Sequence, residues 1–353
     1  MTDPRQYGVL ICISCHDYRR HDVIYGTILF LTVPCHLFVA YVIELWAADQ
    51  AKAAVGKAKR ANDSIKNASQ SDVQDLRNHW HFVALLHGLN ITLNLLVTSL
   101  SVYYSIHHPG IGTLCELHAI VVWLKTSSYA FTNRDLRHAF VFRDTTFAVP
   151  EIYAACPYPQ NITLGNLSYF WWAPTLVYQP VYPRTERIRW TFVLRCAAEV
   201  FALSVAIWIA SAQYAAPLLQ NSLATISNLD IPSIIERLLK LSSISLFCWL
   251  CGFFALFQSY LNLVAEILRF GDRAFYHDWW NSASVRTYWS SWNRPVYSFM
   301  KRHVYLPLVG RGCPPVVAQI IVFIISGILH EMIVGVPTHN ILGKLDMYAN
   351  RSP

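Results

Sequence analysis

The chain has 353 residues, of which 54% are hydrophobic and 14% are charged, and its formal net charge is +7. Soluble globular domains carry about 25% charged residues, so this composition excludes an ordinary soluble domain. The positive charge is spread over several loops, which is typical of charges that orient membrane helices. Nothing in its distribution supports nucleic-acid binding.

Long segments without Asp, Glu, Lys or Arg recur along the chain. Most reach the roughly 20 helical residues that cross a hydrocarbon core about 30 Å thick, whereas a membrane barrel would alternate polar and apolar residues. The sequence therefore predicts an all-α polytopic membrane protein with about six spans. The predicted spans are 24–43, 82–106, 110–124 (which contains Glu116), 200–219, 241–265 and 312–329, the last extended to Pro337.

Two connecting segments have distinct compositions. Residues 48–79 are rich in Ala, Lys, Asn, Ser and Asp, which predicts a polar loop that is either helix-prone or disordered. Residues 269–311 carry seven Lys or Arg against two Asp, together with many aromatic residues. Their i, i+3, i+4 spacing from Val285 to Phe299 predicts an amphipathic helix in the membrane interface. The same composition suits a platform for a phosphorylated, adenine-bearing ligand such as coenzyme A, and both interpretations stay open.

His330 stands at the end of the apolar run 316–329 and is followed by Glu331. An ionisable residue at membrane depth is a functional candidate by default. We expect a buried, neutral imidazole, which suits a general base; a packed core histidine and a proton relay in a transporter are the alternatives. No histidine cluster has the spacing of metal ligands, so we predict no metal site.

Three motifs resemble one known family. FYHDWWN at 275–281, YFWWAPTLVYQPVYPRTERIRW at 169–190 and SGILHEMIVGVP at 326–337 resemble hallmark segments of the membrane-bound O-acyltransferase superfamily. They are similar to its diacylglycerol and sterol O-acyltransferase branch, and most of all to type 1 diacylglycerol acyltransferases, with a first half similar to fungal members. The motif residues in the first segment are Phe275, Tyr276, Asp278, Trp279, Trp280 and Asn281.

The resemblance implies a helical acyltransferase fold and transfer of an acyl group from acyl-CoA to diacylglycerol. His330 would be the general base and Asn293 its polar partner, with Ser326 orienting the thioester. The acyl-CoA path would be lined by Trp289, Trp292, Tyr297 (where relatives commonly have a histidine) and Tyr305, with Arg302 and Lys301 near the CoA phosphates. No cofactor is implied, because acyl-CoA is a co-substrate.

The resemblance also implies a multi-pass protein of the endoplasmic reticulum membrane, surrounded by lipid, and leaves a homo-oligomer open. Relatives usually have further helices at both ends. We therefore expect residues 1–353 to be a single, partial acyltransferase domain, truncated at both ends and without activity as written. Sterol as the acyl acceptor, and a non-catalytic relative that pairs with full-length proteins, remain alternative hypotheses.

Overall fold

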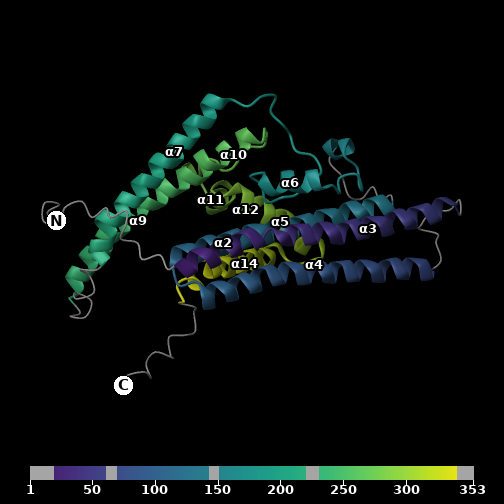
Figure 1. Ribbon diagram of the computed structural model, residues 1–353, viewed down its shortest axis with the longest axis horizontal. Helices are drawn as coiled ribbons and strands as arrows, with labels where there is room; N and C mark the ends of the chain where they lie inside the picture. The colour runs from purple at the N-terminus through teal and green to yellow at the C-terminus, as the bar shows by residue number, and fades with distance from the viewer. Residues whose placement is uncertain (1–19, 61–69, 143–150, 220–229, 340–353) are drawn as a thin grey trace, which may run out of the picture. The chain divides into compact units, whose positions relative to one another are not determined.

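The computed structural model describes residues 20–60, 70–142, 151–219 and 230–339 of the chain (Figure 1). These residues form helices and no β-strand; an isolated antiparallel bridge joins Arg184 to Phe270. The helices divide into two compact units, here called the small unit (183–292) and the large unit (20–182 and 293–339). The all-α prediction is confirmed.

The large unit is built around α5, which packs against α2, α3, α4 and α14. Short helices α6, α12 and α13 and the turns η2 and η6 complete it. Their bounds are α2 Arg20–Thr32, α3 Cys35–Arg60, α4 Gln70–Ser105, α5 Pro109–Phe142, η2 Glu151–Ala155, α6 Leu164–Trp172, α12 Arg294–Met300, η6 Lys301–Tyr305, α13 Leu306–Gly310 and α14 Pro315–Gly335.

The small unit is a helical hairpin followed by the aromatic motif segment. α7 packs against α9 and the π-helical turn η4, and Figure 1 shows α7 and α9 side by side. The elements are α7 Trp190–Ile209, η3 Ala210–Ala215, α9 Ile231–Phe253, η4 Phe254–Tyr260, α10 Leu261–Ile267, η5 Trp279–Asn281 and α11 Val285–Ser291.

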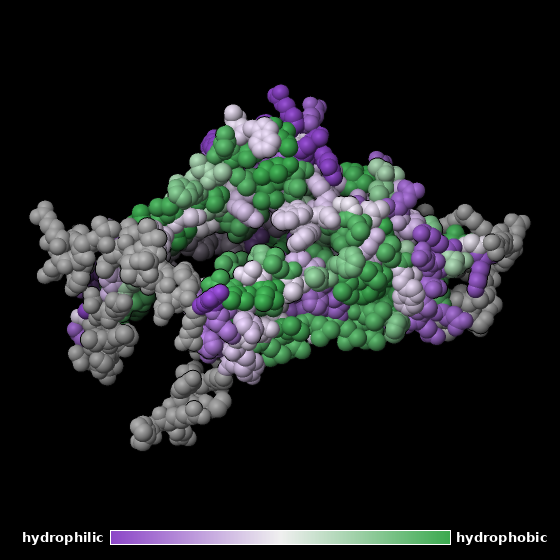
Figure 2. Space-filling model, in the orientation of Figure 1, coloured by the Kyte–Doolittle hydropathy of each residue, from purple (hydrophilic) through white to green (hydrophobic). Residues whose placement is uncertain are grey.

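Within the described residues, five helical segments are long and apolar enough to cross a membrane: Arg20–Lys57, Asp75–Ser105, Trp190–Leu219, Ile231–Ile267 and Pro315–Gly335. Their outward faces carry exposed leucines such as Leu85, Leu89 and Leu96 on α4, and hydrophobic residues cover much of the surface seen in Figure 2. The prediction of a multi-pass membrane protein is confirmed.

The sixth predicted span, 110–124, differs from the other five. It lies inside α5, which is not among the five apolar segments, and its carboxylate Glu116 is fully buried. α5 also buries Lys125, whose ammonium group donates hydrogen bonds of 2.8 Å to the carbonyl oxygens of Phe170 and Ala173. The helix is therefore the polar interior axis of the large unit. Backbone carbonyls pair Lys125, whereas Glu116 accepts one hydrogen bond, of 3.3 Å from the Ser99 hydroxyl, and its Oε1 has no partner among the described residues.

A buried charge cluster ties three helices of the large unit together. Glu44 on α3 accepts a hydrogen bond of 2.8 Å from the Arg137 guanidinium on α5 and lies 3.0 Å from His87 Nε2 on α4. All three side chains are at least nine-tenths buried. Charged groups removed from water persist only when they are paired, so this cluster fixes the packing of α3, α4 and α5.

The two connecting segments have different outcomes. Of the two alternatives for residues 48–79, the structure has the helical one wherever it describes them, because α3 runs to Arg60 and α4 begins at Gln70; residues 61–69 lie outside the described part. The amphipathic helix predicted from Val285 to Phe299 is helical in two pieces rather than one. It is broken into α11 and α12 at Trp292 and Asn293, and the two helices belong to different units.

Candidate functional site

His330 lies near the C-terminal end of α14, on the face that points away from the core of the large unit. Its neighbour Leu329 is buried, whereas the His330 side chain is exposed. Successive residues on a helix point about 100° apart, so burial of Leu329 turns His330 outward. The prediction of a buried imidazole is therefore wrong. Among the described residues, the His330 side chain lies at the protein surface.

The backbone of α14 orients the His330 ring. Nδ1 lies 2.7 Å from the carbonyl oxygen of Ser326, one helical turn earlier. A carbonyl oxygen can only accept, so in the neutral imidazole Nδ1 carries the proton and Nε2 presents a lone pair. That is the tautomer in which Nε2 serves as a base, and among the described residues Nε2 has no hydrogen-bond partner.

The other residue predicted for catalysis, Asn293, begins helix α12. Its side-chain oxygen accepts a hydrogen bond of 3.2 Å from the Val296 amide, which is the usual role of an N-cap residue. The side chain is half-buried, and no hydrogen bond joins it to His330. The cap uses Oδ1 alone, which leaves the Nδ2 donor of Asn293 for another partner.

One core cluster of the large unit links the helices that carry Asn293 and His330. Phe299 and Met300 from α12 are packed in it together with Leu329 from α14, and Val296 contacts the same cluster. Leu329 precedes His330, and Val296 is bonded to Asn293. The two predicted catalytic residues therefore sit on elements that share a hydrophobic core, although the sequence separates them by 37 positions.

The residues predicted for the CoA end of the path lie on α12 and η6. Tyr297 is exposed, and the Lys301 ammonium group lies 5.8 Å from the centre of its ring. The Arg302 guanidinium donates a hydrogen bond of 3.4 Å to the Tyr153 hydroxyl, while Tyr305 is half-buried at the end of η6. Two cations, Lys301 and Arg302, thus lie in this turn.

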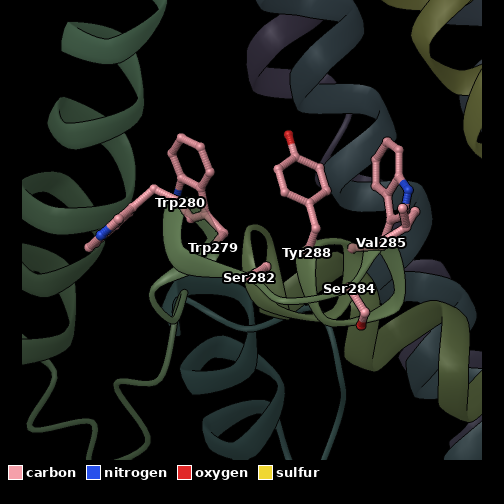
Figure 3. Close-up of a pocket in the computed structure, with 7 residues that line it drawn as sticks. Trp279, Trp280, Ser282, Ser284, Val285 and Tyr288 are labelled. Atoms are coloured by element: carbon pink, nitrogen blue, oxygen red, sulfur yellow. The ribbon is translucent and has the colours of Figure 1, made fainter.

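The FYHDWWN segment lies in the small unit and forms one side of an open groove of about 630 Å³. Trp279 and Trp280 of η5 face Tyr288 and Trp289 of α11, and the Trp279 and Tyr288 rings meet edge to face at 6.0 Å. Figure 3 shows that the Tyr288 ring and the Ser284 hydroxyl point to opposite sides of α11. Ser284 is the N-cap of that helix and accepts from the Thr287 amide at 3.1 Å.

The remaining motif residues hold the groove in place. Phe275 is buried, and the Tyr276 hydroxyl donates a hydrogen bond of 2.8 Å to Gln258 on η4. Asp278 precedes η5, and its carbonyl accepts from the Asn281 amide at 3.1 Å. Trp292, predicted for the acyl-CoA path, contacts the Trp289 and Phe257 rings at 6.5 Å, so its ring belongs to the aromatic packing of this unit.

Two contacts at these sites could not be identified from the sequence motifs. The Ser326 contribution to His330 is its backbone carbonyl rather than its hydroxyl; the spacing of four residues is the signal that could have indicated it. Gln258 has no motif of its own, and only the fold brings it to Tyr276. Among the described residues, no group of His, Cys, Asp and Glu is arranged to hold a metal ion.

Comparison with known proteins tests which family this chain belongs to. The family model described as "MBOAT, membrane-bound O-acyltransferase family" matches residues 80–348. Diacylglycerol O-acyltransferase 1A of Glycine max is 40% identical over 256 residues, covering 70% of this chain and 51% of that protein. Diacylglycerol O-acyltransferase 1 of Dictyostelium discoideum is 36% identical over 342 residues, covering 95% of this chain and 50% of that protein.

The matched region contains the small unit with the aromatic groove, and the large unit from residue 80 onward, including Asn293 and His330. The chain spans about half the length of the curated relatives it matches. Because the family model covers well over half of this chain, the predicted resemblance is confirmed. The chain belongs to the membrane-bound O-acyltransferase family.

Proposed function

We propose that the chain is an acyl-CoA-dependent O-acyltransferase that makes triacylglycerol from diacylglycerol. The observation that carries this proposal is the His330 ring, whose Nδ1 is bonded to Ser326 so that Nε2 is the basic nitrogen. Relatives named diacylglycerol O-acyltransferase 1 support the choice of acceptor.

The proposed reaction uses a single proton carrier. Nε2 of His330 removes the proton from the free hydroxyl of diacylglycerol, and the resulting alkoxide attacks the thioester carbonyl of acyl-CoA. The tetrahedral intermediate collapses, the carbon–sulfur bond breaks, and the imidazolium returns the proton to the CoA thiolate. The proton balance closes within the reaction, so it needs no metal or cofactor. The Nδ2 donor of Asn293 supplies a hydrogen bond to the thioester oxygen.

Two groups of side chains, each considered within its own unit, support an acyl-CoA ligand. Trp279, Tyr288 and Trp289 offer flat surfaces in the small unit, and Lys301 and Arg302 offer positive charge in the large unit. Aromatic rings suit an adenine base, and Lys and Arg suit its phosphates.

The test is an assay of membranes from a host that makes no triacylglycerol or steryl ester of its own. Membranes containing the 353-residue chain receive labelled oleoyl-CoA with either diacylglycerol or a sterol. Labelled triacylglycerol supports the proposal and contradicts the expectation that this form is inactive. Steryl ester would assign the sterol branch, and the absence of both products would overturn the proposal.

Two histidine variants test whether product formation depends on His330. His330→Ala should reduce the rate at least about 100-fold, the range attributed to general base catalysis. His81→Ala is the matched control, since His81 is also an exposed histidine on an apolar helix. Equal loss in both variants would argue against the assignment.

The resemblance to type 1 diacylglycerol acyltransferases also supports an endoplasmic reticulum location and a homo-oligomer. Microscopy of a tagged chain against a marker of that membrane tests the location. Crosslinking of two differently tagged copies tests the assembly.

A further inference from the structure

A buried serine of α5 joins three elements of the large unit. The Ser128 hydroxyl oxygen accepts a hydrogen bond of 2.8 Å from the Tyr178 amide, and the same oxygen lies 2.7 Å from Nε2 of His303. Ser128 is fully buried. The amide can only donate to this oxygen, so the hydroxyl hydrogen is available to His303, and Nε2 accepts it in the neutral tautomer that carries the ring proton on Nδ1.

The surroundings of His303 favour that neutral form. Its ring is packed against Phe299 at 5.1 Å and Phe131 at 5.6 Å. Burial, together with the nearby Arg302 and Arg134 guanidiniums, lowers the pKa of His303 to about 3. Near neutral pH the imidazole is therefore uncharged, and its Nδ1-protonated tautomer accepts a hydrogen bond from the Ser128 hydroxyl.

His303 lies in the middle of η6, a π-helical turn that directly continues α12. Such turns are rare and often occur at functional sites. The Ser128 contact holds this turn against α5 and against the segment that contains Tyr178, across 175 positions of sequence for the His303–Ser128 pair. A turn of unusual geometry thus has a specific long-range bond at its centre.

The consequences of this contact reach the residues of the proposed reaction. Asn293 begins the helix that continues into η6. Phe299, which touches the His303 ring, packs in the core cluster that contains Leu329, the residue before His330. A shift of η6 relative to α5 would therefore move both Asn293 and the packing beneath His330.

We infer that His303 is a positioning residue for the acyl transfer: through Ser128 it holds the α12–η6 helix, and with it Asn293, in place against α5. The inference rests on the proposed function for its effect on turnover. Its effect on the structure is independent of that function. His303 has no part in proton transfer under this inference.

Adjacent serines provide a matched control. Ser127 is also buried on α5, but its hydroxyl has no hydrogen-bond partner, so Ser127→Ala removes the same atom without breaking the contact. His303→Leu fills the apolar space without an acceptor, whereas His303→Gln retains one in its amide oxygen. Ser128→Ala removes the donor. The four variants thus distinguish the effect of losing the hydrogen bond from the effect of changing side-chain volume.

Two measurements on the 353-residue chain in membranes test the inference. Hydrogen–deuterium exchange of the peptide 293–305 reports how strongly its backbone amides are protected, and this measurement does not depend on activity. Ser128→Ala and His303→Leu should raise exchange there and lower kcat about tenfold, with KM for oleoyl-CoA within about twofold, as loss of one buried hydrogen bond allows. Ser127→Ala and His303→Gln should match the wild type in both measurements.

Distinct results would overturn the inference. Unchanged exchange in both Ser128→Ala and His303→Leu would do so, as would an equal effect of Ser127→Ala. If His303→Gln lost as much kcat as His303→Leu while its own hydrogen exchange matched the wild type, His303 would be a proton carrier instead. If the wild type makes no triacylglycerol, the proposed function fails, and exchange alone still decides whether the contact holds the helix. If Ser128→Ala does not fold, the two His303 variants carry the comparison.

Discussion

His330 Nδ1 lies 2.7 Å from the backbone carbonyl oxygen of Ser326, so the main chain of α14 selects the tautomer of the ring. The basic nitrogen, Nε2, is thereby directed away from the helix that carries it. Any residue at position 326 could supply this carbonyl oxygen. The backbone of Ser326 therefore orients the His330 ring, and the Ser326 hydroxyl takes no part in that contact.

The first prediction tests that separation. Ser326→Ala retains the carbonyl, and we expect kcat/KM for oleoyl-CoA to fall less than about tenfold, the range of one neutral hydrogen bond. The measurement is triacylglycerol formation at varied oleoyl-CoA. A loss as large as that of His330→Ala would assign the essential contact to the hydroxyl.

The second prediction concerns the cap of α12. Asn293→Ala should lower the stability by about 1 kcal/mol, because the Val296 amide loses its acceptor. Asn293→Asp keeps the cap and should restore the thermal midpoint in detergent. It should not restore turnover, because aspartate lacks the Nδ2 donor.

A matched variant is available for this cap. Thr163 caps α6 by accepting from the Asn166 amide at 3.2 Å, so Thr163→Ala removes an equivalent bond elsewhere in the large unit. It should lower the midpoint while leaving turnover per folded molecule unchanged. Restored turnover in Asn293→Asp would show that the cap is the whole role of Asn293.

The third prediction concerns the buried charge cluster. Glu44→Gln leaves the Arg137 guanidinium buried without its carboxylate, and we expect a loss of about 3 kcal/mol, seen as a large drop in thermal midpoint. Glu236→Gln removes an exposed partner of Lys240 one turn away on α9 and should leave the midpoint nearly unchanged. Similar midpoints for both variants would contradict the structural role of Glu44.

The fourth prediction concerns the aromatic groove. Trp289→Ala removes a ring that lines it, so KM for oleoyl-CoA should rise by about three- to tenfold, in line with the contribution of an aromatic contact. kcat should change little, because the groove does not include His330. The control is Trp190→Ala, at an exposed tryptophan outside the groove in the same unit. An equal rise of KM in this variant would show that the groove does not bind oleoyl-CoA.

The fifth prediction is a pH dependence from His303. In the unfolded chain this histidine binds a proton below about pH 6.5, whereas burial keeps it neutral in the folded chain until its pKa of about 3. The unfolded state therefore binds more protons between these values, and stability should fall as pH decreases from about 6.5 towards about 3. The slope of thermal midpoint against pH should be smaller in His303→Gln; equal slopes would contradict the shift.

Some features were predictable from the sequence because they depend on neighbouring residues alone. Apolar length predicted the membrane helices, and FYHDWWN and the segment around His330 identified the family. The i, i+3, i+4 pattern continues across the break between α11 and α12, so periodicity alone does not locate it. The Asn293 side chain caps a new helix there, and Pro295 in its first turn is compatible with that start.

By itself, the sequence determined the helical membrane architecture, the family and the candidate residues, because hydrophobic length and short motifs are local properties. Only the tertiary structure decided which charges are buried and which contacts each histidine makes. α5 is the polar axis because four helices surround it. His330 is exposed because Leu329 is packed inward, whereas His303 is half-buried and lies against Ser128, 175 positions earlier, across the fold. Such contacts depend on how distant segments pack, which no local pattern specifies.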